Sequence, residues 1–299
     1  MKNVAASIRD RLMNLARAGG VPFSALLERF VIGRLLWRLS RDDNGRQFVL
    51  KGAHLFSLWA KSPHRPTRDL DLLGSGDPSP GTLQDFFARL LAAPAEPEDG
   101  LIWGEVQTAP IRGDQRYGGV RVTVSVSLAG AVVPAKVDVG FGDAITPAPV
   151  ELIWQDLLEF PEARLLTYPP ETVIAEKLHA AEELGLDNSR MKDFYDLDWL
   201  CRNMEFTHPT LTEAVCATFA RRGTALPETM PLALTQEFAT DTWKLAQWSA
   251  FLRKNRLDAA PLPKVIFRLS AFLKPVLFPA QAFNKNLWQP GIGWQAPQQ

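Results

Sequence analysis

The sequence has few of the residues that would build a disulfide framework or a zinc site. Its 299 residues include two cysteines, Cys201 and Cys216, whose spacing fits neither a metal motif nor a set of disulfides. The four histidines show no spacing typical of a zinc protease or a catalytic triad. We therefore expect both cysteines to be small buried residues of a reducing compartment, and we assign no histidine to a metal.

Long apolar segments are missing as well. No apolar run reaches the roughly 18 residues that a membrane-spanning helix needs. The charged N-terminus is not followed by the apolar stretch of a secretory signal. Hydrophobic residues make up 46% of the chain and charged residues 22%, which is ordinary for a globular protein. These features predict a cytoplasmic protein without a membrane partner.

The net charge is zero, but the two signs are unevenly distributed. Residues 1–68 carry 13 Lys and Arg against 4 Asp and Glu, a balance of +9. Residues 69–243 carry 12 against 28, a balance of −16, and residues 244–299 carry 8 against 1, a balance of +7. Basic ends around an acidic middle suit a chain whose ends contact a polyanion and whose middle binds metal. Basic helices that are simply solvated are the open alternative.

Periodicity divides the chain into a mixed first part and a helical second part. The first part alternates expected helices with expected strands: helices over 4–18, 22–41, 53–60 and 82–93, and strands over 48–50, 69–73, 102–108, 120–128 and 135–139. Residues 146–170 hold five prolines and are interpreted as a connector. The second part has expected helices over 171–186, 190–204, 210–222, 235–254 and 262–273, and then a loose tail from residue 289. We predict an α+β fold, with a mixed sheet and flanking helices over 1–165 and an all-helical domain over 166–299.

Two aspartates, Asp69 and Asp71, alternate with apolar residues in a predicted strand. Residues i and i+2 of a strand point to the same side, so the two carboxylates should lie side by side. Like charges this close are costly unless a cation neutralises them, and Mg²⁺ is commonly held by one or two carboxylates plus substrate phosphates. Such a pair taken alone also occurs on plain exposed strands, so its context decides between a metal site and a solvated face.

The context includes a glycine and a third carboxylate. Gly52 ends a predicted strand 17 residues before Asp69, and a short predicted helix follows it. A glycine at such a turn lets backbone N–H groups approach a phosphate, although it can equally cap a helix. Asp138 lies in an otherwise mostly apolar strand, where an unpaired carboxylate would be expensive. Asp138 is therefore either a third metal ligand or an aspartate on an edge strand.

A fourth segment combines basic and acidic residues on two successive helices. Asp193 and Asp196 share one helix face through their three-residue spacing. Lys177 on the preceding helix could bind a triphosphate, and Arg190 and Lys192 could contact phosphates of a nucleotide or nucleic acid. A helix hairpin joined by surface salt bridges is the alternative interpretation.

The order of these segments resembles the AbiEii/AbiGii toxin family of nucleotidyltransferases, including the MenT-type toxins. The resemblance covers about residues 45–200, roughly half of the chain, and its segments are specific only together. They are Lys51-Gly52-Ala53, Thr67–Leu72 (TRDLDL), Val137–Gly140 (VDVG), Ala175–Leu178 (AEKL) and Arg190–Asp196 (RMKDFYD). The resemblance implies a DNA-polymerase-β-like catalytic domain followed by a helical domain that completes the active site.

The resemblance also implies roles for individual residues. Asp69 and Asp71 would hold Mg²⁺ or Mn²⁺ as the catalytic core, with Asp138 as a third metal ligand. Lys177 would steady the phosphates of the NTP, and Asp193 would position either Lys177 or the acceptor.

The nucleotide would be bound by a second set of residues, which comprises Lys51, Gly52, Ala53, Arg68 and Arg190 in addition to Lys177. The family usually has a second Gly or a Ser where this chain has Ala53. Backbone N–H donation survives that change, whereas a hydroxyl contact to phosphate is lost.

Finally, the resemblance implies a substrate and partners. The expected reaction transfers NMP from an NTP to an RNA acceptor, the 3′ end of tRNA above all, as the toxin of a toxin–antitoxin system with a cognate antitoxin. Two alternatives stay open at this point. One is a nucleic-acid- or partner-binding protein on an altered transferase fold, and the other is a transferase that modifies a small molecule or a protein.

Overall fold

The computed structural model describes residues 3–60, 64–111, 118–278 and 285–296. The chain forms two compact units. One consists of Met1–Gly142 and Val150–Thr167, and the other of Asp143–Pro149 and Tyr168–Gln299. From sequence a single division at residues 165/166 is expected, and no local signal assigns residues 143–149 to the second unit.

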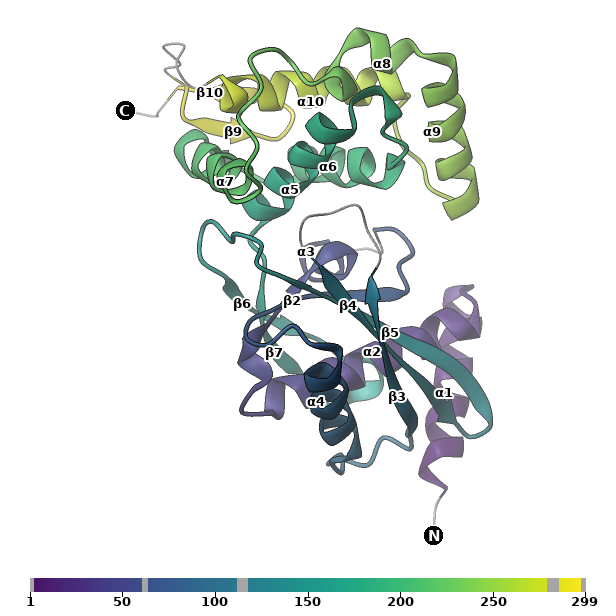
Figure 1. Ribbon diagram of the computed structural model, residues 1–299. Helices are drawn as coiled ribbons and strands as arrows, with labels where there is room; N and C mark the ends of the chain where they lie inside the picture. The colour runs from purple at the N-terminus through teal and green to yellow at the C-terminus, as the bar shows by residue number, and fades with distance from the viewer. Residues whose placement is uncertain (1–2, 61–63, 112–117, 279–284, 297–299) are drawn as a thin grey trace. The chain divides into compact units, whose positions relative to one another are not determined.

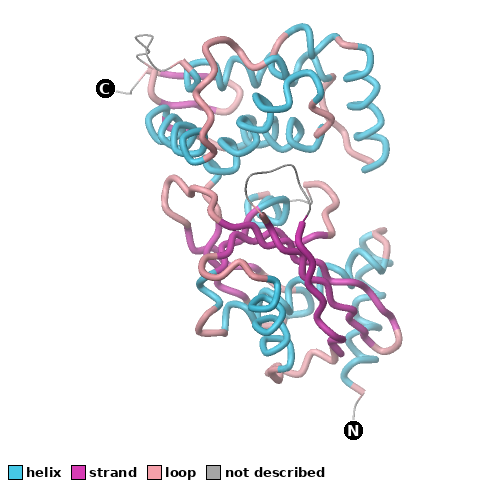
Figure 2. Tube along the Cα trace, viewed as in Figure 1, coloured by secondary structure: helices cyan, strands magenta, loops and turns pink. Residues whose placement is uncertain are grey.

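A mixed sheet forms the centre of the first unit, with seven strands among the described residues (Figures 1 and 2). The strand order is β3-β4-β5-β2-β1-β7-β6. β2 runs parallel to β5 and β1 runs parallel to β7, whereas the other neighbours are antiparallel. In chain order the strands are β1 (Phe48–Lys51), β2 (Asp69–Gly74), β3 (Ile102–Ile111), β4 (Gly119–Leu128), β5 (Ala131–Phe141), β6 (Val150–Trp154) and β7 (Ala163–Thr167).

Helices cover one face of this sheet because its strands alternate apolar and polar residues. On β2, Leu70 and Leu72 are fully buried, whereas Asp69 and Asp71 between them are only partly covered. α2 packs on β5 and β7, α4 packs on β3 and β4, and the two helices contact each other. The polar face of β2 is therefore the face opposite these helices. The helices of this unit are α1 (Val4–Gly19), α2 (Phe23–Arg41), the short α3 (Phe56–Trp59) and α4 (Pro80–Ala92).

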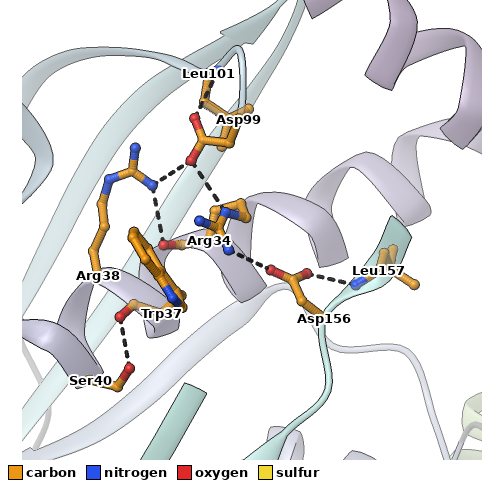
Figure 3. Close-up of polar contacts among 8 residues, drawn as sticks. All are labelled: Arg34, Trp37, Arg38, Ser40, Asp99, Leu101, Asp156 and Leu157. Carbon is orange, nitrogen blue, oxygen red and sulfur yellow. Dashed lines mark hydrogen bonds and ion pairs between the residues drawn. The ribbon is translucent and has the colours of Figure 1, made fainter. Parts of the chain in front are cut away.

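A cluster of buried charges anchors α2 to two loops (Figure 3). Arg34 lies 3.3 Å from Asp99 and 3.3 Å from Asp156, and Arg38 lies 2.6 Å from Asp99. Arg34 is completely buried. Gly33 leaves the room that Asp156 fills, since a Cβ there would overlap the carboxylate. Two arginines and two aspartates thus cancel one another, which is the condition for keeping charges out of water.

The second unit is mainly helical, as expected, but it also contains a small antiparallel sheet of order β10-β9-β8 in its described part. The expected loose tail from residue 289 is therefore wrong as far as Gln295, because Gly293–Gln295 forms a strand of this sheet. Trp288 donates a hydrogen bond to the Cys201 carbonyl at 2.8 Å, and Trp294 donates one to the Phe272 carbonyl at 2.9 Å. The elements are α5 (Pro170–Leu184), α6 (Met191–Asn203), β8 (Phe206–Thr207), α7 (His208–Arg221), α8 (Gln236–Thr240), α9 (Thr242–Asn255), α10 (Leu262–Leu277), β9 (Leu287–Gln289) and β10 (Gly293–Gln295).

Other expectations are met in part. The proline-rich connector forms β6 and β7. The single helix expected over 235–254 is instead two helices, α8 and α9. Asp241 separates them and caps α9, because its side chain accepts a hydrogen bond from the Lys244 N–H. Cys201 is buried and Cys216 is half-buried, and neither is in a disulfide. Among the described residues, no helix has the length and apolar character needed to cross a membrane.

We predict that Asp156 makes the stability of the first unit fall as pH rises. Burial raises the pKa of its carboxyl to about 6, against the lowering effects of the Leu157 N–H and of Arg34. A folded-state pKa above the unfolded value of about 4 means that the folded state binds the proton more tightly. The stabilisation is complete below about pH 4 and is lost as pH rises through about 6. The free energy of unfolding of the wild type, minus that of Asp156→Asn, should fall by on the order of 2–3 kcal/mol over this window, measured by urea denaturation. A difference that rises instead would mean that Arg34 outweighs burial.

Candidate active site

The three aspartates expected at the active site lie on neighbouring strands of the first unit. Asp71 on β2 is directly opposite Asp138 on β5, and Asp138 is directly opposite Arg121 on β4. On its other side, Asp71 is opposite Lys51 at the end of β1. Directly opposed residues project from the same side of a sheet. Across four strands the structure therefore makes a row of charges in the order Arg121, Asp138, Asp71, Lys51.

Asp138 has a counter-charge that the sequence does not suggest. Both of its carboxylate oxygens accept hydrogen bonds from Arg121, from Nε and Nη2, each at 2.7 Å. Nη2 of Arg121 also lies 3.9 Å from Asp69. The hydrogen bonds to Asp138 raise the pKa of the guanidinium further above its ordinary value. The edge-strand interpretation of Asp138 is wrong, since β5 lies between β4 and β2.

Gly52 combines an unusual backbone with a close approach to Asp71. Its φ of +75° lies in the left-handed region that favours glycine. A Cβ at this position would also overlap the carboxylate of Asp71. The turn from β1 into the 3-10 helix Gly52–Leu55 therefore brings backbone next to the carboxylate row. Any side chain at position 52 would displace one or the other.

The remaining residues expected to bind nucleotide in this unit have different surroundings. Lys51 is half-buried at the end of β1, and Ala53 is buried. Arg68 has an exposed side chain, 3.7 Å from Glu28. His54 belongs to the core and contacts the Trp154 ring. Burial lowers the pKa of His54 to about 4, so its imidazole is neutral at physiological pH.

Lys177, Asp193, Asp196 and Arg190 lie together in the second unit. Nζ of Lys177 on α5 is 2.6 Å from Asp193 and 2.9 Å from Asp196, both on α6. Nε of Arg190 is 2.9 Å from the second oxygen of Asp193. The Lys177 side chain is 15% exposed, and those of Asp193 and Asp196 are 4% and 0% exposed. The two salt bridges of Lys177 are thus buried rather than superficial, and Asp193 holds Lys177, whereas the Arg190 side chain is 41% exposed.

Lys244 supports this cluster and has no signal in the sequence. It lies on α9, far along the chain from Arg190, and is itself buried. Its Nζ donates to the backbone carbonyl of Asn188 at 3.2 Å. The side chain of Asn188 in turn accepts from the Arg190 N–H at 2.9 Å. Lys244 therefore fixes the loop from which Arg190 reaches Asp193.

The donors in the first unit suit a magnesium-like cation only in part. Among the described residues, no group of three or more His, Cys, Asp or Glu side chains is arranged as a ready metal site. Asp69 and Asp71 provide oxygen donors on one face, and Mg²⁺ needs only one or two carboxylates when phosphates and water complete its shell. Both oxygens of Asp138 already accept from Arg121. The pair therefore fits the ion, and the third carboxylate would have to change partner.

Comparisons with known proteins identify the family and the fold of this chain. A family model described as "Nucleotidyl transferase AbiEii toxin, Type IV TA system" matches residues 34–272. The crystal structure of a candidate nucleotidyltransferase from H. pylori is similar with a TM-score of 0.50 and 15% identity, covering 87% of this chain and 97% of that one. JHP933 from Helicobacter pylori gives 0.48 and 14%, with 85% and 92% covered. No match was found among curated proteins. At this identity the first likeness shows the fold, an α+β nucleotidyltransferase fold.

Lys177 and Asp69 should differ sharply in their effect on stability. Lys177→Met leaves two buried carboxylates without their shared counter-ion, so it should lower the free energy of unfolding by about 3–5 kcal/mol. Asp69→Asn changes a side chain that is 43% exposed and should stay within about 0.5 kcal/mol of wild type. Urea denaturation followed by circular dichroism measures both. Equal effects of the two substitutions would contradict the burial of the Lys177 cluster.

Proposed function

This chain belongs to the AbiEii family of nucleotidyl transferase toxins and is a nucleotidyltransferase, and we propose that it transfers NMP from an NTP to an RNA acceptor with release of pyrophosphate. The acceptor we favour is the 3′ end of tRNA, whose modification would stop translation. The observation that carries the proposal is that Asp69 and Asp71 share one face of β2, where Asp71 lies opposite Asp138 and beside the Gly52 turn.

Asp69 and Asp71 are proposed to hold Mg²⁺ or Mn²⁺. Such an ion lowers the pKa of an attacking hydroxyl and offsets charge on the leaving pyrophosphate. Asp71 is well placed for this role because the Gly52 backbone and the Asp138 strand restrict where its carboxylate can lie. Asp138 is proposed as the third ligand once Arg121 releases it.

The phosphates of the NTP are proposed to be bound by basic side chains and by backbone. In the first unit these are Lys51, Arg68 and the N–H groups at Gly52 and Ala53. The family resemblance also implies phosphate contacts for Lys177 and Arg190, which Asp193 holds within the second unit by ion pairs of 2.6 and 2.9 Å. A lysine already fixed by two carboxylates loses little side-chain freedom when it meets a phosphate, which favours binding.

An exposed face of α10 supports RNA as the acceptor. Lys264, Phe267, Ala271 and Lys274 are exposed at spacings of three and four residues, which places them on one side of the helix. Phe267 is 78% exposed, and α10 contains no acidic residue. The two lysines are separated by about 15 Å along the axis. Exposed aromatic rings between basic groups are the usual surface for stacking bases while binding the strand's phosphates. We name these four residues the α10 basic face.

The transfer reaction should depend on Asp71. Wild-type protein incubated with each labelled NTP and total tRNA should label RNA when Mg²⁺ or Mn²⁺ is present and should fail in chelator. Asp71→Asn should remove the activity and keep the fold, because the substitution is nearly isosteric and the side chain is only partly buried. Full labelling by Asp71→Asn would refute the catalytic assignment.

The same pair of proteins tests the toxin role in cells. Expression of the wild type should arrest growth, whereas Asp71→Asn should not. Arrest by both proteins would point to toxicity through binding and not through turnover.

Replacing the two lysines of the α10 basic face should make RNA binding weaker and less dependent on salt. Each phosphate contact to a single strand contributes roughly 0.7 to the log–log slope of affinity against salt. Lys264→Ala/Lys274→Ala should therefore reduce that slope by about 1.4, measured by fluorescence anisotropy from low to physiological salt. Arg164→Ala is the matched control, because Arg164 is 66% exposed but lies in the acidic middle of the chain. An unchanged slope for the double variant would exclude this face as the RNA surface.

A further inference from the structure

Arg121 is the one charged residue of β4, whose ten residues are all described. The strand alternates valines, which are buried, with residues on the opposite face, where Arg121 is followed by Thr123, Ser125 and Ser127. Small hydroxyl side chains are therefore sufficient for most of that face. The single arginine lies directly opposite Asp138, so we attribute its presence to its charge interaction with that carboxylate.

The contact between Arg121 and Asp138 is bidentate, which is the strongest geometry available to this pair. Two bonds of 2.7 Å engage both oxygens of Asp138, and the same guanidinium is 3.9 Å from Asp69. A divalent cation that uses Asp138 must break at least one of these bonds. It must also bind close to a fixed positive charge, since charges about 4 Å apart interact strongly even near a protein surface.

We propose that Arg121 is a built-in counter-ion that competes with the divalent cation for Asp138 and so sets the affinity of this site for the cation. The inference rests on the proposed metal-dependent transfer. Without metal, the guanidinium offsets the repulsion among Asp69, Asp71 and Asp138. When the cation binds without nucleotide, its ligands from the protein are limited to the carboxylates of Asp69 and Asp71. When an NTP is present, its phosphates supply additional negative charge, and this charge makes binding of the cation favourable.

The arrangement predicts that removing Arg121 strengthens binding of the metal alone, which is the opposite of what loss of an ordinary substrate contact does. Arg121→Met should bind Mn²⁺ at least about tenfold more tightly than the wild type, measured by isothermal titration and by electron paramagnetic resonance without nucleotide. Arg121→Lys keeps the charge but loses the bidentate fork, so its affinity for Mn²⁺ should lie between those of the wild type and Arg121→Met. The Arg121 side chain is 42% exposed and that of Asp138 is 19% exposed, so water reaches the pair and both variants should fold.

A second substitution shows whether the competition acts through Asp138. In an Asp138→Asn background, Arg121→Met should improve Mn²⁺ affinity by clearly less than it does in the wild type. An equal improvement in both backgrounds would overturn competition for Asp138 and leave only a general effect of charge. Weaker NTP binding with unchanged Mn²⁺ affinity in Arg121→Met would overturn the inference by making Arg121 a phosphate ligand.

Failure of this inference can be separated from failure of the proposed function. If Mn²⁺ binds the wild type in a manner that Asp71→Asn abolishes, and Arg121→Met leaves the affinity unchanged, only the counter-ion role is wrong. If Mn²⁺ binds neither the wild type nor Arg121→Met, the metal site itself is wrong, and the Arg121 inference fails with it.

Discussion

The parallel register of β2 and β5 places Asp71 directly beside Asp138, and the chemistry of the first unit follows from that constraint. Two carboxylates at neighbouring positions repel each other, so the sheet must provide positive charge on both sides. It does so with Arg121 on β4 and Lys51 on β1. Gly52 then lets backbone come close to Asp71 without a side chain between them. Asp69, which lies 3.9 Å from Arg121, adds a third carboxylate to the two positive and two negative charges of the row, so this face of the sheet carries a small excess of negative charge.

A second group of opposite charges, on and around α2, is buried and has a structural role. Arg34, Arg38, Asp99 and Asp156 are buried and pair with one another, which fixes α2, although Nη2 of Arg34 and Nε of Arg38 have no hydrogen-bond partner among the described residues (Figure 3). The row on the opposite face of the sheet is half-exposed. Water can therefore reach it, and incoming ligands can replace existing partners. An exchange of partners therefore costs less at the half-exposed carboxylate row than in the buried cluster of Arg34, Arg38, Asp99 and Asp156.

Sequence reasoning worked where a local period decides the geometry. Alternation along one strand predicted that Asp69 and Asp71 share a face, and the three-residue spacing predicted that Asp193 and Asp196 do, as their common contact with Lys177 confirms. It failed where the geometry depends on register or long-range packing. Nothing near Arg121 in the chain shows that it will face Asp138. The strands β8, β9 and β10 were not predicted because two or three residues are too few to show an alternating pattern. The strands β6 and β7 lie in the proline-rich stretch that was interpreted as a connector.

The residues expected to act in transfer therefore fall into two energetic classes, and this decides how variants must be interpreted. Asp69 and Arg121 are 43% and 42% exposed, so their removal changes charge at the site with little cost to folding. Lys177, Asp193 and Asp196 form a buried ion cluster in which removal of one member leaves its partners unpaired. Loss of activity in a Lys177 variant can then arise from unfolding of its cluster. The same loss in an Asp69 variant cannot, and for this reason the carboxylate row is the more informative place to test the chemistry.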